Sequence, residues 1–288
     1  MGMGTFLIEI KDRLMKNLTV IPEKEREQHI LENMIWGIDN DKSKYNMAIK
    51  LLKTNEQNSH IRKEDSLQKE WTNLPKNFRY SQMNVNATHD SPRLLTCFAN
   101  KGKYKYHVNP YENPRCITGK PDKDTYNRVR LYLMHQFTIP GSPSIWNGDE
   151  MGMWGSDDPD NRKPLWWPDT KFEPETRTNI QPGFKLYDEV KFDADHYHFY
   201  KQIISLRKNN PVLATGEIEF ISSEDRVLAY RRWNSSDEIF VCLNTDTTSH
   251  RIKFASKGKF VDLLSGRIIK GKSIPILPLE GLILRRVE

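Results

Sequence analysis

The sequence has few cysteines and no long apolar run. Its 288 residues include three cysteines, Cys97, Cys116 and Cys242, which lie far apart and show no CxxC spacing. They predict neither a disulfide framework nor a cysteine metal site, and are weakly typical of a reducing compartment. No apolar run approaches the roughly 18 residues that a membrane helix requires. We therefore expect a soluble protein, cytoplasmic or periplasmic, that has no membrane partner.

Blocks of like charge are also missing. The formal charge is +6, but 44 basic residues are scattered among 38 acidic ones with no stretch of five or six of one sign. This pattern indicates a solvated surface more than a surface that binds nucleic acid. With 37% hydrophobic and 28% charged residues, the composition is that of a globular protein with a polar surface.

Apolar residues at helical spacing predict three helices in the first part of the chain, at Thr5–Leu18, Pro22–Ile38 and Lys44–Leu52. The segment Asn55–Asn77 is strongly polar. It is followed by a weakly alternating run, Phe78–Val85, which we expect to form a strand.

A second α/β unit follows. Thr125–Phe137 has helical spacing, Pro140–Pro143 breaks it, and Ser144–Asn147 is a short strand candidate. We expect this strand to lie parallel to the first one. The long excursion Met151–Asp193 has little periodicity, and loops of that length are usually functional.

The last part of the chain changes character. A helix capped by Asp193 or Asp195 ends near Asn209, and short β-type runs follow it without further helices. These runs are Glu217–Phe220, Val227–Trp233, Ile239–Asn244, Ile252–Phe254, Phe260–Leu264 and Gly281–Leu284. Such strands predict an antiparallel β-sandwich. We therefore expect two domains, residues 1–210 and 211–288.

Three blocks carry a family resemblance. Asn84–Arg93 ends a strand-like run with His-Asp and, three residues later, Arg; Pro140–Met153 and Asp158–Arg162 follow in order. Together they resemble the α-amylase family of glycoside hydrolases, in particular cyclomaltodextrinases and neopullulanases. The resemblance implies the C-terminal part of a (β/α)8 TIM barrel, from about the sixth helix to the eighth, followed by a C-terminal β domain.

The same resemblance implies roles for single residues. His89 would bond hydroxyl groups of the sugar at the cleavage point, and Asp90 would stabilise the oxocarbenium-like transition state. A carboxylate suits that task because it accepts two hydrogen bonds and opposes developing positive charge. Asp158 and Arg162 would hold the next glucose unit, although a surface ion pair is the alternative reading.

Trp154 and Trp166 are candidates for stacking on pyranose rings, with core packing as the alternative. The sequence identifies no cofactor and no metal ligand. Calcium belongs to some full-length relatives in the resembling family, but its usual ligands would lie in a part of the barrel not found in this chain.

The two catalytic carboxylates that the resemblance implies are not found in this sequence. Retaining hydrolysis needs a nucleophile and an acid about 5 Å apart; in the resembling family they lie at the ends of the fourth and fifth barrel strands, and no family-like Gly-x-Arg-x-Asp block precedes His89. We therefore expect a segment of an enzyme that cleaves α-1,4 or α-1,6 glucosidic bonds, inactive by itself. Its expected partners are an α-glucan oligosaccharide and the N-terminal portion of the barrel, in the same or a separate chain. The alternative is a non-catalytic glucan-binding or assembly module.

Other features carry less chemistry. Asp149 and Glu150 are adjacent, so they would point to opposite faces of a strand and are expected to be structural. His196 and His198 stand two residues apart, which on a helix places them on different faces and argues against a metal site. Thr88 stands where the resembling family has Asn or Ser.

Overall fold

The computed structural model of this protein describes residues 22, 36–38, 60–62, 76–100, 108–110, 113–176, 186–222 and 226–287. The chain divides into two compact units, residues 1–70 and 71–288. The domain boundary expected near residue 210 stays a prediction.

In the first unit, two short strands, β1 (Trp36–Ile38) and β2 (His60–Arg62), pair in parallel. We expected Trp36–Ile38 to be the end of a helix, and this is wrong. The three residues pair with a strand far along the chain, a long-range contact that local apolar spacing does not reveal. The rest of the three expected N-terminal helices lies outside the described residues, apart from Pro22.

The second unit begins with an α/β arrangement. Its elements are α5 (Lys76–Ser81), β3 (Met83–Asn84), α6 (Leu94–Ala99), α7 (Lys123–Thr138) and β4 (Ser142–Pro143). Strands β3 and β4 pair in parallel, with Met83 opposite Ser142. The expected parallel pairing is confirmed, although β4 lies just before the expected strand Ser144–Asn147.

The expected strand Phe78–Val85 is wrong over its first half, because α5 extends through Ser81. The helix is fastened by tertiary contacts. The Tyr80 hydroxyl donates a hydrogen bond to the Gly216 carbonyl oxygen, and Lys76 pairs with Glu217. Only the end of the expected strand, β3, is extended and paired.

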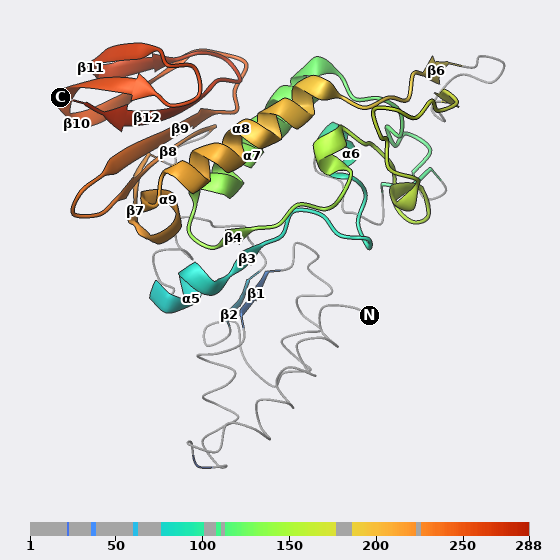
Figure 1. The fold of residues 1–288 in the computed structure, drawn as a ribbon, viewed down its shortest axis with the longest axis horizontal. Helices are drawn as coiled ribbons and strands as arrows, with labels where there is room; N and C mark the ends of the chain where they lie inside the picture. Colours follow the sequence, from blue (N-terminus) through green and yellow to red (C-terminus); the bar gives the residue numbers. More distant parts are fainter. Residues whose placement is uncertain are drawn as a thin grey trace. The chain divides into compact units, whose positions relative to one another are not determined.

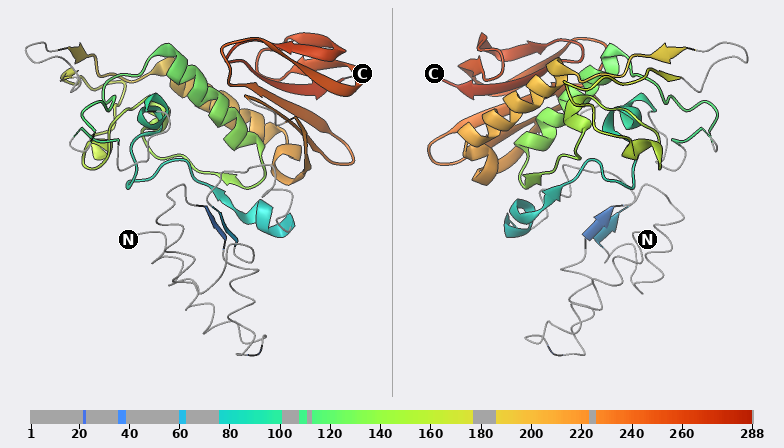
Figure 2. Two further views of the ribbon diagram at one scale, coloured as in Figure 1. Left: turned by 180° about the vertical axis from the view of Figure 1, so that it is seen from behind. Right: turned by 45° about the vertical axis from the view of Figure 1, so that its right-hand side comes forward.

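Two long helices form the centre of this unit. Helix α7 begins at Asp122, whose side chain accepts a hydrogen bond from Thr125 N at 2.8 Å, and α8 (Ala194–Asn209) begins likewise at Asp193. They pack side by side in every view (Figures 1 and 2). Both helices agree with the sequence-based expectation.

Between the two helices the chain makes short elements. They are the 3-10 turns η2 (Asp149–Met151) and η3 (Asp160–Arg162) and the antiparallel pair β5 (Glu175–Thr176) and β6 (Tyr187–Asp188). Gly148 and Gly152, on either side of η2, have φ values of 99° and 79°, which only glycine adopts readily. The loop that follows β4 thus makes a tight turn between these two glycines, closed by hydrogen bonds from Met151 N to Gly148 O and from Gly152 N to Asp149 O.

A short helix, α9 (Val212–Thr215), leads into six antiparallel strands. The strands are β7 (Glu217–Ser222), β8 (Val227–Trp233), β9 (Glu238–Asn244), β10 (His250–Asp262), β11 (Ile268–Ile276) and β12 (Gly281–Arg286). Their order in the sheet is β11-β10-β12-β9-β8-β7.

We expected an antiparallel sandwich. The antiparallel strands are present, but hydrogen bonds join them into a single sheet. Strands β11 and β9 touch although two strands separate them in the sheet, so the sheet folds over its own inner face. That face buries one apolar cluster, which includes Phe240, Phe254 and Phe260. The runs expected at 252–254 and 260–264 are largely one long strand, β10, and β11 was not expected.

The other face of the sheet packs on the helices. Arg232 of β8 is fully buried, and its guanidinium donates to the carbonyl oxygens of Thr138, at the end of α7, Leu213 (2.7 Å) and Gly216 (2.8 Å). Tyr230 shares a 2.5 Å hydrogen bond with the Thr138 hydroxyl. Polar contacts to helix-end carbonyls thus fasten α7 to the sheet.

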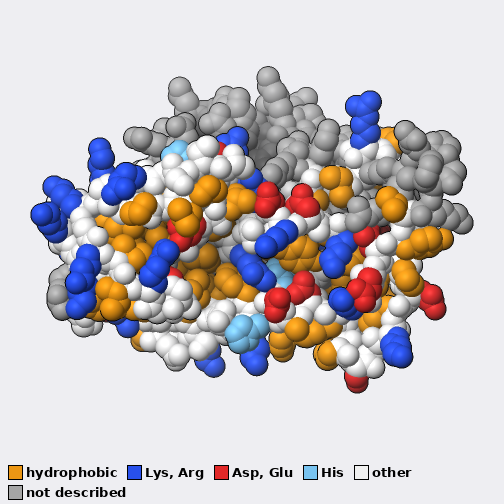
Figure 3. Space-filling view, turned by 90° about the horizontal axis from the view of Figure 1, so that it is seen from above, with side chains coloured by type: hydrophobic (Ala, Val, Ile, Leu, Met, Phe, Trp, Pro, Cys, Tyr) orange, Lys and Arg blue, Asp and Glu red, His pale blue; other side chains and the backbone are white. Residues whose placement is uncertain are grey.

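Acidic and basic side chains both lie on the face drawn in Figure 3, with apolar ones between them. Within the described part of the chain, none of the helices combines the length and the apolarity that crossing a membrane demands.

Candidate functional site

The candidate site begins where β3 and β4 end. Ser144 N donates to the Asn84 carbonyl oxygen at 3.1 Å, which continues the pairing by one step. The Gln136 side chain of α7 donates to the carbonyl oxygens of both Asn84 (2.6 Å) and Ser144 (2.9 Å). The loops that follow the two strands therefore start side by side.

His89 and Asp90 occupy a tight turn in the loop after β3. Ser91 N donates to the Thr88 carbonyl oxygen at 3.2 Å, and Asp90 N donates to the Thr88 hydroxyl at 3.2 Å. The His89 and Asp90 side chains are 60% and 63% exposed, with His89 Nε2 lying 3.4 Å from Asp90 Oδ1. The turn presents both side chains to solvent, and the Thr88 hydroxyl supports its backbone.

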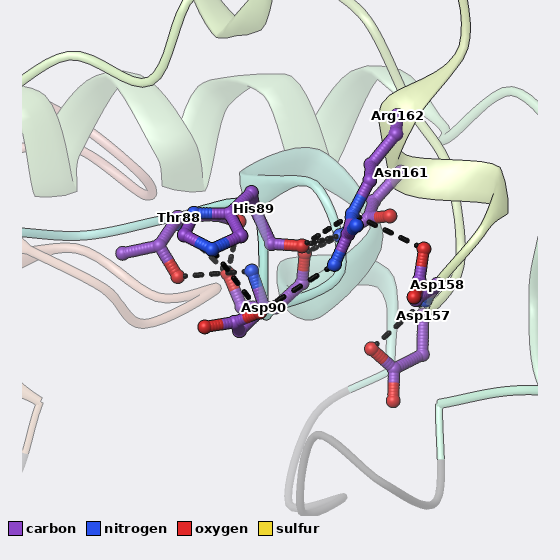
Figure 4. A network of polar contacts seen from close by, with 8 residues as sticks. Thr88, His89, Asp90, Asp157, Asp158, Asn161 and Arg162 are labelled. Atoms are coloured by element: carbon purple, nitrogen blue, oxygen red, sulfur yellow. Dashed lines mark hydrogen bonds and ion pairs between the residues drawn. The ribbon is translucent and has the colours of Figure 1, made fainter. Parts of the chain in front are cut away.

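A second loop reaches back to this turn. Arg162 Nε lies 3.1 Å from the His89 carbonyl oxygen and 3.1 Å from Asp158 Oδ1, and Arg162 Nη2 lies 3.5 Å from Asp90 Oδ1. Figure 4 shows the guanidinium lying between the two carboxylates. The structure thus brings together four residues singled out from the sequence: His89, Asp90, Asp158 and Arg162.

Asn161, next to Arg162, anchors the backbone of the same turn. Its side chain is buried, and its amide nitrogen donates to the carbonyl oxygens of His89 (2.8 Å) and Ser91 (2.7 Å). Sequence reasoning assigned Asn161 no role, although it stands inside the Asp158–Arg162 block. The Asn fixes the turn while the Arg contacts its exposed groups.

Trp154 and Trp166 lie inside the protein. They are 2% and 1% exposed, and their rings meet edge to face with centroids 4.3 Å apart. A pyranose ring needs an open aromatic face, so the stacking role expected for these two residues is not supported, and their core-packing reading fits. Trp167 is 52% exposed and offers such a face.

A buried ion pair lies under the loops. Arg93 and Asp149 are each 2% exposed, with Nη1 and Oδ1 3.5 Å apart, and Arg93 Nη1 also donates to the Asn147 carbonyl oxygen at 2.7 Å. Burial raises the pKa of Asp149 to about 7, against the opposing effect of Arg93. The pair joins the loop after β3 to the loop after β4, and sequence reasoning missed it. The expectation of a structural role for Asp149 fits this burial.

Trp146 connects this pair to the exposed histidine. The Arg93 guanidinium lies 5.4 Å from the centre of the Trp146 ring, and the centre of the His89 ring lies 6.2 Å from that of Trp146. Cation–π and ring contacts of this kind hold a side chain in place without covering its polar atoms. Trp146 is therefore a neighbour of both Arg93 and His89.

A cavity of about 620 Å³ adjoins Asp158. Its lining residues are Asn109, Pro110, Thr118, Ser156, Asp157, Asp158, Pro159, Asp160, Glu175 and Thr176. Lys163 Nζ pairs with both Asp160 (3.0 Å) and Glu175 (2.8 Å), which offsets part of the acidic charge. The cavity extends the candidate site away from His89 and Asp90.

No group of three His, Cys, Asp or Glu side chains in the described ranges is arranged to hold a metal ion. His196 is buried between the rings of Tyr126 and Tyr200, whereas His198 is exposed. The two histidines therefore lie on different faces of α8.

Comparison with known proteins finds a matching family model and several relatives. Residues 32–216 match the family model described as the alpha-amylase catalytic domain. A cyclomaltodextrinase of Geobacillus thermopakistaniensis is 27% identical over 222 residues, 74% of this chain and 30% of the relative. A cyclomaltodextrinase of a Bacillus species is 31% identical over 151 residues, 52% of this chain and 23% of the relative. Neopullulanase 2 of Thermoactinomyces vulgaris is 26% identical over 212 residues, 70% of this chain and 28% of the relative.

Solved structures agree in fold. The alpha-amylase of Geobacillus thermoleovorans in complex with acarbose has a TM-score of 0.53 at 15% identity, covering 99% of this chain and 57% of its own. An Anoxybacillus alpha-amylase has a TM-score of 0.52 at 16% identity, covering 91% of this chain and 45% of its own. The fold is thus that of a TIM-barrel glycosidase with a C-terminal β domain, and the chain spans at most about 30% of the length of the curated relatives named above.

Proposed function

This chain belongs to the alpha-amylase family. We propose that it forms the substrate-binding part of a retaining glycoside hydrolase that acts on α-glucans. In this proposal Asp90 stabilises the transition state and His89 bonds sugar hydroxyl groups. Asp158 and Arg162 hold the neighbouring glucose unit. The nucleophile and the general acid come from a portion of the barrel outside this chain.

One observation carries the proposal: Arg162 lies between Asp90 and Asp158, at 3.5 Å and 3.1 Å. A planar guanidinium can orient two carboxylates at once, and carboxylate oxygens accept hydrogen bonds from hydroxyl groups such as those of a sugar. Bonds that strengthen as the sugar ring gains positive charge lower the barrier, because they favour the transition state over the ground state.

Within the barrel, we assign β3 and β4 to the seventh and eighth strands. They are parallel neighbours joined through α6 and α7, and the candidate site lies beyond their carboxyl ends, where TIM barrels carry their active sites. Two parallel strands leave open edges that further barrel strands would pair with. The chain matches only 30% of the length of the Geobacillus cyclomaltodextrinase, which also supports a further portion of the barrel outside this chain.

Two measurements test the proposal. The first is an assay of the chain against maltooligosaccharides, cyclodextrins and pullulan, in which we expect no turnover. Clear turnover by the purified chain would contradict the proposal that the nucleophile and the general acid come from outside this chain. The second is calorimetric titration with maltoheptaose of the wild type, Asp158→Ala and the control Asp169→Ala, an exposed aspartate outside the network. We expect weaker binding only in Asp158→Ala. Unchanged binding in that variant would favour a glucan-binding module that uses the C-terminal sheet.

A further inference from the structure

A second cavity, of about 490 Å³, lies between α8 and the C-terminal sheet. Its lining residues are His198, Lys201, Gln202, Ser205, Leu206, Asn209, Asn210, Leu263, Leu264 and Arg285. We call it the α8 pocket. None of its residues belongs to the loops that form the candidate site, and its volume is within the range of small-ligand sites.

One wall of the α8 pocket is a single face of the helix. Its lining positions recur three, four or seven residues apart from His198 to Asn209, which places them along one side of α8. All of them except Leu206 are exposed, whereas the opposite side of the helix, with Tyr200 and Ile203, is buried in the core. Packing in the core therefore does not account for this row of polar side chains.

The floor of the pocket is fixed before any ligand arrives. Asn210 is buried; its amide nitrogen donates to the Leu206 carbonyl oxygen at 2.5 Å, and its carbonyl oxygen accepts from Arg285. Arg285 also donates to both carboxylate oxygens of Asp237, at 3.1 Å and 2.7 Å. A preformed floor lowers the ordering cost of binding.

The far wall is equally well held. Leu263 and Leu264 follow β10 directly, where the Asp262 carboxylate accepts from Ser265 N and from Ile283 N, both at 3.1 Å. These bonds fix the turn that carries the two leucines. The pocket thus combines the two leucines of this turn with a helix face that is polar except for Leu206.

The chemistry of the lining selects the ligand. No carboxylate lines the pocket; of its basic groups, Arg285 is paired with Asp237, while His198 and Lys201 are exposed side chains of α8. Amide and hydroxyl groups of Gln202, Ser205 and Asn209 both donate and accept hydrogen bonds, as sugar hydroxyl groups do. The leucines match the apolar C–H faces of a sugar ring.

We propose that the α8 pocket is a second carbohydrate-binding site, which takes a short, neutral α-glucan such as maltotriose. The choice of α-glucan among neutral sugars rests on the proposed function. The α8 pocket is separate from the candidate site at His89 and Asp90, so in this proposal the chain binds glucan at two places.

Calorimetric titration of the full chain with maltotriose tests this. Asp158→Ala tests the candidate site at His89 and Asp90, and the double variant Gln202→Ala/Asn209→Ala tests the α8 pocket. Lys208→Ala is the control, because Lys208 is exposed on the same helix but does not line the pocket. In the Asp158→Ala background we expect residual binding that the double variant weakens by about tenfold or more, because at least two hydrogen bonds are lost. Lys208→Ala should leave it unchanged. Thermal melting of each variant controls for folding.

The outcomes separate the two proposals. Loss of all maltotriose binding in Asp158→Ala, with no effect of the double variant, overturns the α8 pocket and leaves the proposed function of the candidate site standing. Binding that depends only on Gln202 and Asn209 supports the pocket and contradicts the proposed role of the candidate site. If inorganic phosphate binds in a salt-dependent manner that Lys201→Ala abolishes, while maltotriose does not bind the pocket, the site takes anions and the proposal is wrong.

Discussion

Arg162 Nε lies 3.1 Å from the carbonyl oxygen of His89, a residue 73 positions earlier in the chain. This contact joins the tip of the Asp158–Arg162 loop to the turn that presents His89 and Asp90. The candidate site is therefore a product of two loops, and neither loop alone would hold its geometry.

We predict that Arg162→Lys and Arg162→Ala weaken maltoheptaose binding progressively. Lysine keeps the charge but cannot contact Asp158, Asp90 and the His89 carbonyl in one plane. Because Arg162 is 45% exposed, the free energy of unfolding should fall by only about 1 kcal/mol or less. Calorimetry and urea unfolding measure the two effects. A large loss of stability with unchanged binding would assign Arg162 a purely structural role.

Asp149 predicts a dependence of stability on pH. Its pKa is raised by burial from 3.8 to about 7, so the folded chain binds the proton more tightly than the unfolded chain. That stabilisation is present at low pH and is lost as the pH rises from about 4 towards 7. Asp149→Asn has no carboxyl group at this position and lacks this pH dependence. The free energy of unfolding of the variant minus that of the wild type should therefore rise by roughly 2 to 4 kcal/mol between pH 4 and pH 7.5. Urea unfolding at both pH values checks this; a constant difference would contradict it.

His196 predicts the opposite trend. Burial lowers its pKa from 6.5 to about 4, so the unfolded chain takes up a proton that the folded chain does not. Stability is therefore lost as the pH falls from about 6.5 towards 4. His196→Phe should unfold at a higher temperature than wild type at pH 5, with a smaller difference at pH 8. His198→Phe, at an exposed position of the same helix, controls for the effect of introducing a phenylalanine.

The tryptophans predict a contrast between packing and binding. Trp166→Ala should lower the free energy of unfolding by about 3 to 5 kcal/mol, because it leaves a cavity in the core. Trp167→Ala, at a 52% exposed position, should cost less than about 1 kcal/mol. Chemical denaturation separates the two. Similar losses for both variants would show that Trp167 also packs tightly.

The fold could be predicted where local signals are strong. The α7 segment has helical apolar spacing and a capping aspartate, and it was placed to within two residues at its N-terminal end. Strand β11 was missed because Gly271, with a φ of 143°, and Pro275 interrupt a weak alternation. The segment 78–81 misled because its helix depends on contacts to Gly216 and Glu217, which no local pattern contains.

The candidate site shows the same division. The residues of the His89 and Asp158 blocks were found because each block is contiguous in the sequence. The Arg93–Asp149 pair was missed because its members stand 56 residues apart, and only the parallel pairing of β3 with β4 brings them together. The buried state of Trp154 and Trp166 likewise depends on tertiary packing that composition does not encode.

Gln136 has a mechanical consequence for the site. Its amide nitrogen holds the carbonyl oxygens of Asn84 and Ser144, and its carbonyl oxygen accepts from Asn86 at 3.2 Å. A single side chain of α7 thus bonds the first residues of both loops. The first residues of the loop that carries His89 and of the loop that carries Trp146 are therefore coupled through one amide, and a substitution at Gln136 would disturb both loops at once.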